Sequence, residues 1–323
     1  MSIVSELKDK IYGGGMVERA EACQLCDAPL QELMTAADEI REYFCQNTFD
    51  LCTIVNGKCG KCSEDCKFCA QSAYNDTVID HVHGLLDTET LVADARKNYL
   101  QGILRYSIVT SGRALTKREV DQVCESIRRI RSEVGIQVCV SFGLLDKEDF
   151  MKLKEAGASR VHCNLESSRR YFAEICSTHT YDEKIQTIRA AKEAGLTVCS
   201  GGIIGLGETM EDRIDLALTV RSLGVRSVPV NMLNPIPGTP FGKNKIMTND
   251  ELCRVVSIFR FLIPDGNIRL AGGRGLIGDK GVQCFKSGAN AAITGDLLTT
   301  SGITVEMDHK LLKELGFIVK SSS

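Results

Sequence analysis

The chain has 323 residues, of which 43% are hydrophobic and 25% are charged, and its formal net charge is -3. This composition is typical of a globular protein, and without a basic excess it excludes nucleic acid as an expected partner. The N-terminus lacks the apolar run of a signal peptide, and no later stretch is apolar enough to span a bilayer. We therefore expect a cytoplasmic protein that does not associate with a membrane.

Fifteen cysteines are the first unusual feature of the chain. A cytosolic protein does not keep that many as disulfides, and an odd number cannot pair completely. Metal or sulfur chemistry explains the excess better. Some of the thiols are still expected to be ordinary core residues, since Cys124 and Cys253 fall within helical patterns and suit packing as small apolar side chains.

Residues 1–48 are expected to form a helical N-terminal extension. Apolar residues recur at three- and four-residue steps between Leu30 and Ala37, which is the period of an amphipathic helix. Cys23 and Cys26 also lie in this segment. They admit two interpretations, either a ligand pair that reaches across to a metal centre or two thiols on the inner face of a helix, and the second is favoured.

A cluster of four cysteines follows, within the stretch Cys59–Cys69. Cys62, Cys66 and Cys69 keep the spacing C-x3-C-x2-C. Three thiolates on one tight loop can hold three corners of a cubane iron–sulfur cluster and leave the fourth iron open, as catalytic metal sites keep an open position. A compact zinc site made by all four cysteines is the alternative, because C-x2-C pairs also bind zinc.

Residues 49–323 alternate short β-branched runs with amphipathic stretches. Strand–helix repetition with eight candidate strands predicts an α/β fold of the (β/α)8 TIM-barrel type. The expected strands are 50–55, 104–110, 137–142, 160–164, 197–200, 227–231, 267–270 and 291–294. Gly157 and Gly195 stand where a glycine closes a helix. An open doubly wound sheet is the alternative, but it would usually show fewer repeats.

Polar residues recur on one face of these strands. Residues two apart share a face, and the opposite faces are apolar enough to be covered by helices, so the polar set should point into the barrel lumen. The set comprises Arg105, Ser107, Gln137, Cys139, Ser141, Thr197, Cys199, Asn231, Asn267 and Arg269. Ordinary barrels fill the lumen with branched apolar side chains. A lumen that holds Cys139, Cys199 and Arg269 therefore indicates an internal site with a second metal or cluster.

A glycine-rich run, residues 199–208, follows one strand and precedes a helix. It lacks the spacing of a dinucleotide fingerprint, and no Walker lysine follows it. Its glycines, including Gly205 and Gly207, would allow a ligand to approach the backbone closely. The run is expected at the C-terminal mouth of the barrel, where the active sites of this fold lie.

The cysteine loop, with Phe68 in its C-x-aromatic-C position, resembles that of the radical S-adenosylmethionine (SAM) superfamily. Together with the motifs at 198–208, 228–233, 268–270 and 288–291, it resembles the biotin synthase family from about residue 54 to the C-terminus. The resemblance implies a 4Fe-4S cluster on the three loop cysteines, and a homodimer in most members. It also implies insertion of sulfur into dethiobiotin to form biotin.

The resemblance further implies how the site is used. The open iron binds the amino and carboxylate groups of SAM, and a small-protein electron donor is expected to supply the electron that yields a 5'-deoxyadenosyl radical, which takes hydrogen from an unactivated carbon. The implied SAM contacts are Phe68, Glu166, Gly205, Gly207 and Glu208. The implied substrate contacts are Asn164 and Asn231, whose amides suit a neutral ureido ring, and His162, where the family often has asparagine.

One departure concerns the auxiliary 2Fe-2S cluster from which this family takes its sulfur, bound by three strand cysteines and one arginine. The matching positions are Ser107, Cys139, Cys199 and Arg269, so the first cysteine is absent. A thiolate is a better iron ligand than a serine alkoxide. We therefore hypothesise that another cysteine replaces it and gives a variant cluster. The candidates are Cys59 first, and then Cys23, Cys26 and Cys163.

Two other functions remain open from the sequence. Ser107 and His162 leave room for another radical SAM enzyme of the same branch, similar to the [FeFe]-hydrogenase maturase or to methylornithine synthase, although the retained lumen cysteines and Arg269 argue against it. A non-enzymatic zinc or electron-carrier module is the hypothesis from a different class.

Overall fold

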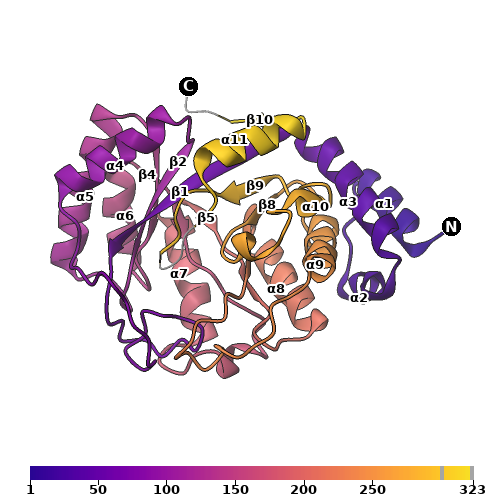
Figure 1. Cartoon of the computed structure of the whole chain (residues 1–323), viewed down its shortest axis with the longest axis horizontal. Helices are drawn as coiled ribbons and strands as arrows, with labels where there is room; N and C mark the ends of the chain where they lie inside the picture. Colours follow the sequence, from indigo (N-terminus) through magenta and orange to yellow (C-terminus); the bar gives the residue numbers. More distant parts are fainter. Residues whose placement is uncertain (299–301, 321–323) are drawn as a thin grey trace.

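The structure is a computed structural model in which residues 1–298 and 302–320 are described. Its centre is a ring of eight parallel strands (Figure 1), in which β9 pairs with β1 and closes the barrel. These strands are β1 (Thr48–Lys58), β2 (Arg105–Thr110), β3 (Gln137–Ser141), β4 (Ala158–His162), β5 (Thr197–Cys199), β7 (Ser227–Met232), β8 (Asn267–Leu270) and β9 (Ala291–Ile293). The expected (β/α)8 barrel is confirmed.

Two short strands were not predicted. β6 (Gly202–Ile204) pairs with β7, so the glycine-rich run is partly strand, and β10 (Ile318–Val319) pairs with β1 outside the ring. The strand predicted at 160–164 lies two residues earlier in the structure, where β4 begins at Ala158 and ends at His162. Asn164 therefore lies beyond the strand end, at the barrel mouth.

Helices surround the ring (Figure 1). They are α4 (Thr88–Leu100), α5 (Lys117–Glu133), α6 (Lys147–Glu155), α7 (Tyr181–Glu193), α8 (Met210–Ser222), α9 (Asn249–Leu262), α10 (Val282–Phe285) and α11 (Val305–Glu314), with 3-10 turns η2 (Phe172–Glu174) and η3 (Arg274–Leu276). Helices α5, α7, α8 and α9 each follow an N-cap threonine, whose hydroxyl accepts from the third helical amide, while the carboxylate of that third residue accepts from the threonine amide. This reciprocal capping explains why the helices begin where they do.

The N-terminal residues form α1 (Ile3–Tyr12), α2 (Arg19–Gln24), the 3-10 turn η1 (Leu25–Asp27) and α3 (Leu30–Cys45). These elements lie outside the helical ring, where α3 packs on α9 and α2 on α8 (Figure 1). Arg19 anchors α2 to α8 through Asp215, with 2.7 Å between Nε and Oδ1. The extension thus covers the outside of the barrel, away from its lumen.

The alternation of the strands separates the core from the site. Residues such as Tyr106, Val138, Val228 and Ile268 are fully buried under the helices. Their neighbours in sequence point into the lumen, where Arg269 and Arg105 both contact Asp50. Among the described residues, no helix combines the length and the apolar character needed to cross a membrane.

Candidate active site

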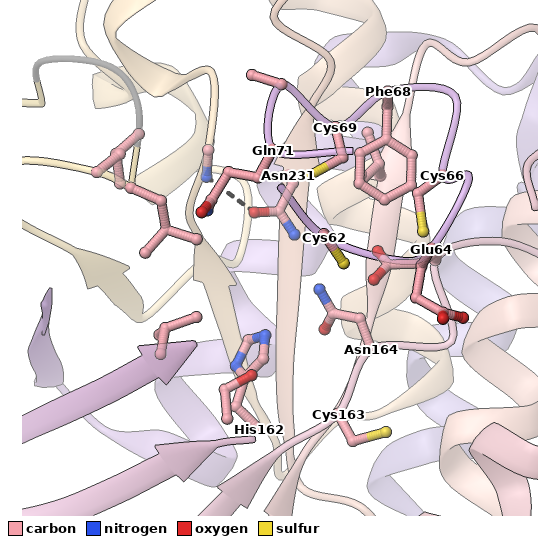
Figure 2. Close-up of a pocket in the computed structure, with 18 of the residues that line it drawn as sticks. Cys62, Glu64, Cys66, Phe68, Cys69, Gln71, His162, Cys163, Asn164 and Asn231 are labelled. Carbon is pink, nitrogen blue, oxygen red and sulfur yellow. Dashed lines mark hydrogen bonds between the residues drawn. The ribbon is translucent and has the colours of Figure 1, made fainter. Parts of the chain in front are cut away.

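A cavity of about 410 Å³ lies at the C-terminal ends of the strands. That volume is within the range of small-molecule sites. The loop between β1 and α4 forms one wall and the strand ends form its floor (Figure 2). The predicted site residues that line it are Cys62, Cys66, Phe68, Cys69, Ser107, His162, Cys163, Asn164, Glu166 and Asn231.

Hydrogen bonds to the backbone hold the cysteine loop in shape. Asn75 Nδ2 donates to the carbonyls of Cys66 (3.2 Å) and Cys69 (2.9 Å). The Cys62 amide donates to the Gln71 carbonyl at 2.7 Å. The loop therefore presents its thiols to the cavity from a backbone whose polar groups are already paired.

The three loop thiols suit ligation to iron. Cys62 Sγ accepts from the Gly112 amide at 3.2 Å. Burial raises the pKa of Cys69 to about 11, although the nearby amides of Gln71 and Ser72 oppose this rise. Such donors stabilise thiolate ligands once a metal displaces the thiol protons.

Cys59 does not share the cavity with the other three cysteines of this stretch. Cys59 pairs with His83 through two backbone hydrogen bonds of 2.9 and 3.0 Å and does not line the cavity. Within the described parts of the chain, the only group of three or more metal-ligating side chains whose ligand atoms lie within 4.8 Å is Cys66, Cys176 and His179. The loop therefore offers Cys62, Cys66 and Cys69 to the cavity without Cys59.

Glu166 is held in an uncommon backbone conformation beside these thiols. Its φ is 67°, the left-handed region that a glutamate rarely adopts. Its amide donates to the Gly201 carbonyl, and its carbonyl accepts from the Ile203 amide. One carboxylate oxygen lies 3.8 Å from Lys184 Nζ, and the other is buried with no partner in the described structure. An unpaired buried oxygen that faces a cavity suits the hydroxyl groups of a ligand such as a ribose.

The glycine-rich run does not line the cavity as expected. Gly205, Gly207 and Glu208 are absent from its walls, to which the run contributes Ile203. Glu208 Oε1 instead accepts from the Gly205 amide at 2.9 Å and from Arg213 Nε at 2.6 Å. Glu208 therefore fixes the shape of this loop.

The need for two of the glycines comes from strand packing. A Cβ atom on Gly201 would lie 2.0 Å from the Pro229 carbonyl oxygen, and one on Gly202 would lie 2.3 Å from that of Glu166. The backbones of β6, β7 and the segment after β4 thus approach too closely for any side chain. The contacts with SAM expected at Gly205, Gly207 and Glu208 stay a prediction.

The two predicted asparagines line the cavity but differ in their partners. Asn231 accepts from the Gly272 amide at 2.9 Å and donates to the Gly202 carbonyl at 3.0 Å. Asn164 Oδ1 accepts from the Gly201 amide at 3.1 Å, and its side-chain amide points into the cavity (Figure 2). Asn164 is therefore better placed than Asn231 to donate to a ligand.

A second set of thiols lies deeper in the lumen, and it includes a cysteine that the sequence analysis missed. Cys52 on β1 contacts Arg269, with 3.1 Å between Sγ and Nη1. Cys139 lies two residues before Ser141, which lines the cavity, so the two side chains share one face of β3. Cys199 on β5 is paired in register with His162 on β4, which also lines the cavity. Applying the two-residue alternation to the first strand, at positions 50, 52 and 54, would have identified Cys52.

Charge and burial set the protonation of this deeper group. Burial raises the pKa of Cys52 to about 12 despite the nearby Arg269 guanidinium. Burial also acts on Cys199, but the His162 imidazole and two arginines outweigh it and lower that pKa to about 6. Asp50 is buried too, and Arg269 and Arg105 lower its pKa to about 2. Three thiols beside a buried arginine form a donor set that fits an iron–sulfur cluster.

The predicted substitutes for the missing thiol lie elsewhere. Ser107 lines the cavity. Cys23 in α2 and Cys26 in η1 lie outside the helical ring, and Cys59 pairs with His83. Cys163 lines the cavity but points away from His162 (Figure 2). The contact that joins a further thiol to Arg269 is made by Cys52.

The model of the Radical SAM superfamily matches residues 58–220, and that of the Biotin and Thiamin Synthesis associated domain matches residues 229–318. A biotin synthase of Brachyspira hyodysenteriae is 54% identical, over 98% of this chain and 95% of the relative. Another, from Akkermansia muciniphila, is 53% identical over 99% of both.

Solved structures share the fold. Methylornithine synthase has a TM-score of 0.85 at 19% identity, with 98% of each chain covered. The FeFe-hydrogenase maturase from Carboxydothermus hydrogenoformans has a TM-score of 0.80 at 17% identity, over 98% of this chain and 79% of the maturase. These likenesses concern the barrel alone.

The barrel, the three-cysteine loop at its mouth and the superfamily match define a radical SAM enzyme. Membership of this class confirms the prediction of an enzyme and argues against an electron-carrier or zinc module. The full-length relatives narrow it further, and the chain belongs to the biotin synthase family, as its motifs predicted.

Proposed function

We propose that this protein forms biotin by inserting sulfur into dethiobiotin. The observation that carries the proposal is the presence of two sets of sulfur ligands, one at the barrel mouth and one in the lumen. Cys62, Cys66 and Cys69 stand at the mouth, and the lumen thiols stand beneath the cavity floor. A substrate in the cavity would lie between them, within reach of both.

Cys62, Cys66 and Cys69 would hold a 4Fe-4S cluster with SAM at its open iron. When bound, this pair supplies the one-electron cleavage of SAM that yields the 5'-deoxyadenosyl radical. The chain's own residues position SAM and limit access of water. Glu166 offers its free oxygen to the ribose, Phe68 covers the base, and Lys184 holds the other Glu166 oxygen at 3.8 Å.

Cys52, Cys139, Cys199 and Arg269 would hold the auxiliary iron–sulfur cluster, with Cys52 in place of the thiol missing at Ser107. Arg269 is 1% exposed and Asp50 is 2% exposed. The Arg269 guanidinium is therefore a buried cation beside the thiolates, and it is paired with the Asp50 carboxylate. A buried charge needs such a partner. One of these ligands differs from the usual set, so a variant of the usual auxiliary cluster would form.

Dethiobiotin would bind across the cavity floor. The amide of Asn164 faces the cavity and can donate to a ureido carbonyl, and His162 lies between the cavity and Cys199. Asn231 supports this wall through its backbone contacts.

The remaining assignments follow from the family and the composition. We assign the enzyme to the cytoplasm, since all fifteen cysteines are free thiols. A small-protein electron donor would reduce the cluster at the mouth, and the resemblance favours a homodimer.

The test supplies SAM, dithionite and dethiobiotin to the anaerobically reconstituted protein and measures biotin and 5'-deoxyadenosine by mass spectrometry. Both products are expected. Deoxyadenosine without biotin would overturn the substrate assignment, and the absence of both would overturn the radical assignment.

A further inference from the structure

A second group of metal-ligating side chains shares one cysteine with the loop at the mouth. The sulfurs of Cys66 and Cys176 and a ring nitrogen of His179 all lie within 4.8 Å of one another. Cys176 Sγ is 3.3 Å from His179 Nδ1. Two cysteines and one histidine are a ligand set typical of zinc, and ligand atoms in a tetrahedral zinc site lie roughly 3.3–3.8 Å apart. The group therefore needs little movement to surround one ion.

The sequence holds only part of this group. Cys176 and His179 are three residues apart, in the segment between η2 and α7. Two ligands at a short spacing of this kind commonly bind the same metal. Cys66 comes from a loop that is more than 100 residues away in sequence. The three side chains are therefore brought together by the fold.

Hydrogen bonds to the backbone hold the two segments against each other beside these ligands. The amide of the residue after Cys66 donates to the carbonyl of the residue before Cys176 at 3.0 Å. Asp65 Oδ1 accepts from the amides of Ser177 (2.8 Å) and Thr178 (3.1 Å). The two thiols are thus positioned by neighbours on both sides, as a preorganised metal site requires.

The surroundings of His179 suit a metal ion that enters from the cavity. Its ring packs on that of Phe172, with 5.7 Å between the centroids, which fixes its orientation. Glu64 Oε2 lies 2.6 Å from His179 Nδ1 and places a carboxylate beside the ligands. Glu64, Cys66 and His179 all line the cavity, whereas Cys176 is 4% exposed. The cavity therefore gives an ion a path to the group.

We propose that Cys66, Cys176 and His179 bind a single divalent metal ion such as zinc, and that this ion and the 4Fe-4S cluster compete for Cys66. The competition rests on the proposed function, because it requires that cluster. Three protein ligands leave a fourth position, which water fills from the cavity, as in other zinc sites of this type. A Cys66 thiolate held by this ion is not free to be the terminal ligand of a cluster iron.

The first test measures zinc binding to the cluster-free protein by equilibrium dialysis. Every sample carries Cys62→Ala and Cys69→Ala, so that the loop cannot bind zinc through its three thiols. Cys176→Ser and His179→Gln should each weaken the binding of one zinc equivalent. The rise in Kd should exceed the roughly 100-fold that loss of a supporting partner causes at a metal site.

Matched substitutions of a cysteine and a histidine elsewhere control this test. Cys124→Ser on α5 and His309→Gln on α11 should bind zinc as tightly as the background. Cys66→Ala, at a half-buried position, replaces a test variant that does not fold and should lose the same equivalent. Unchanged zinc binding in the folded test variants would overturn the proposed site, as would an equal loss in the controls.

The second test uses the protein with all its cysteines. One equivalent of zinc added before iron and sulfide should suppress the SAM-responsive cluster signal in electron paramagnetic resonance, and Cys176→Ser should restore that signal. Equal signals with and without zinc, or no restoration in the variant, would overturn the competition. If the protein gives no such signal without zinc, the proposed function fails and the competition with it, whereas zinc binding alone decides the metal site.

Discussion

The mouth and the lumen of this barrel hold thiols in opposite ways. At the mouth, Cys62, Cys66 and Cys69 are partly exposed on one loop, and the Cys62 sulfur accepts from a backbone amide. In the lumen, Cys52 and its partners are buried on separate strands beside a buried arginine and aspartate. The mouth can admit a cofactor from solvent, whereas the lumen must balance its charges before any metal binds.

The largest expected effect separates the two sites. Cys69→Ala should remove deoxyadenosine and biotin formation together, because it breaks the SAM cluster. Cys199→Ala should remove biotin but keep deoxyadenosine formation. Losses should exceed the roughly 100-fold that a lost supporting partner causes at a metal site. Product analysis by mass spectrometry checks this prediction. Loss of both products in the Cys199 variant would contradict the functional separation of the two sites.

The next effect concerns charge balance in the lumen. Asp50→Asn leaves Arg269 buried without its carboxylate partner, which costs about 3–5 kcal/mol when one member of a buried pair is removed. Urea unfolding under anaerobic conditions measures the loss. Asp308→Asn breaks another buried pair, with Arg274, away from the thiols. It should destabilise the fold similarly but leave the lumen iron in place, unlike Asp50→Asn.

The same carboxylate predicts a dependence on pH. The folded pKa of Asp50 is about 2, below an unfolded value of about 3.9. Its contribution is therefore complete above the unfolded pKa and is lost as the pH falls toward 2. The difference in unfolding free energy between wild type and Asp50→Asn should shrink between pH 5 and pH 2. A constant difference would contradict the ion-pair account.

At the mouth, Glu166→Gln should weaken SAM binding. Loss of a hydrogen bond to a charged group costs about 1.5–3 kcal/mol, or roughly a 10- to 150-fold rise in Kd. Glutamine keeps the size of the side chain, so the turn is preserved. Equilibrium binding of SAM measures the effect, and Glu174→Gln, an exposed neighbour, is the matched control. An unchanged Kd would remove Glu166 from the SAM site.

The smallest effect is expected from Asn75→Ala. This change removes two hydrogen bonds from the loop carbonyls, each worth about 1 kcal/mol. Iron uptake at the mouth should slow, while the lumen site loads normally. Asn98→Ala removes a similar amide contact within α4 and should slow neither site. Slower loading of both sites in the Asn75 variant would contradict the local role of this loop.

The difference between the mouth and the lumen also explains which residues could be predicted from the sequence. The mouth motif is contiguous, so Cys62, Cys66 and Cys69 were found from spacing, and the barrel followed from repetition. Cys52 was missed because its neighbours in the site lie on other strands, more than 80 residues away in sequence for Cys139. The contacts of Glu208 with Gly205 and Arg213 could not be predicted, because a motif shows that a residue is needed but not whether it faces a ligand or the loop.

The most direct test of the account asks which thiol completes the lumen site. In a Cys62/Cys66/Cys69→Ala background, only the auxiliary cluster can form, and its iron and sulfide are measured after anaerobic reconstitution. Adding Cys52→Ala should remove that iron and sulfide, whereas adding Cys59→Ala should leave both in place. Retention of the cluster without Cys52, or its loss without Cys59, would contradict the account.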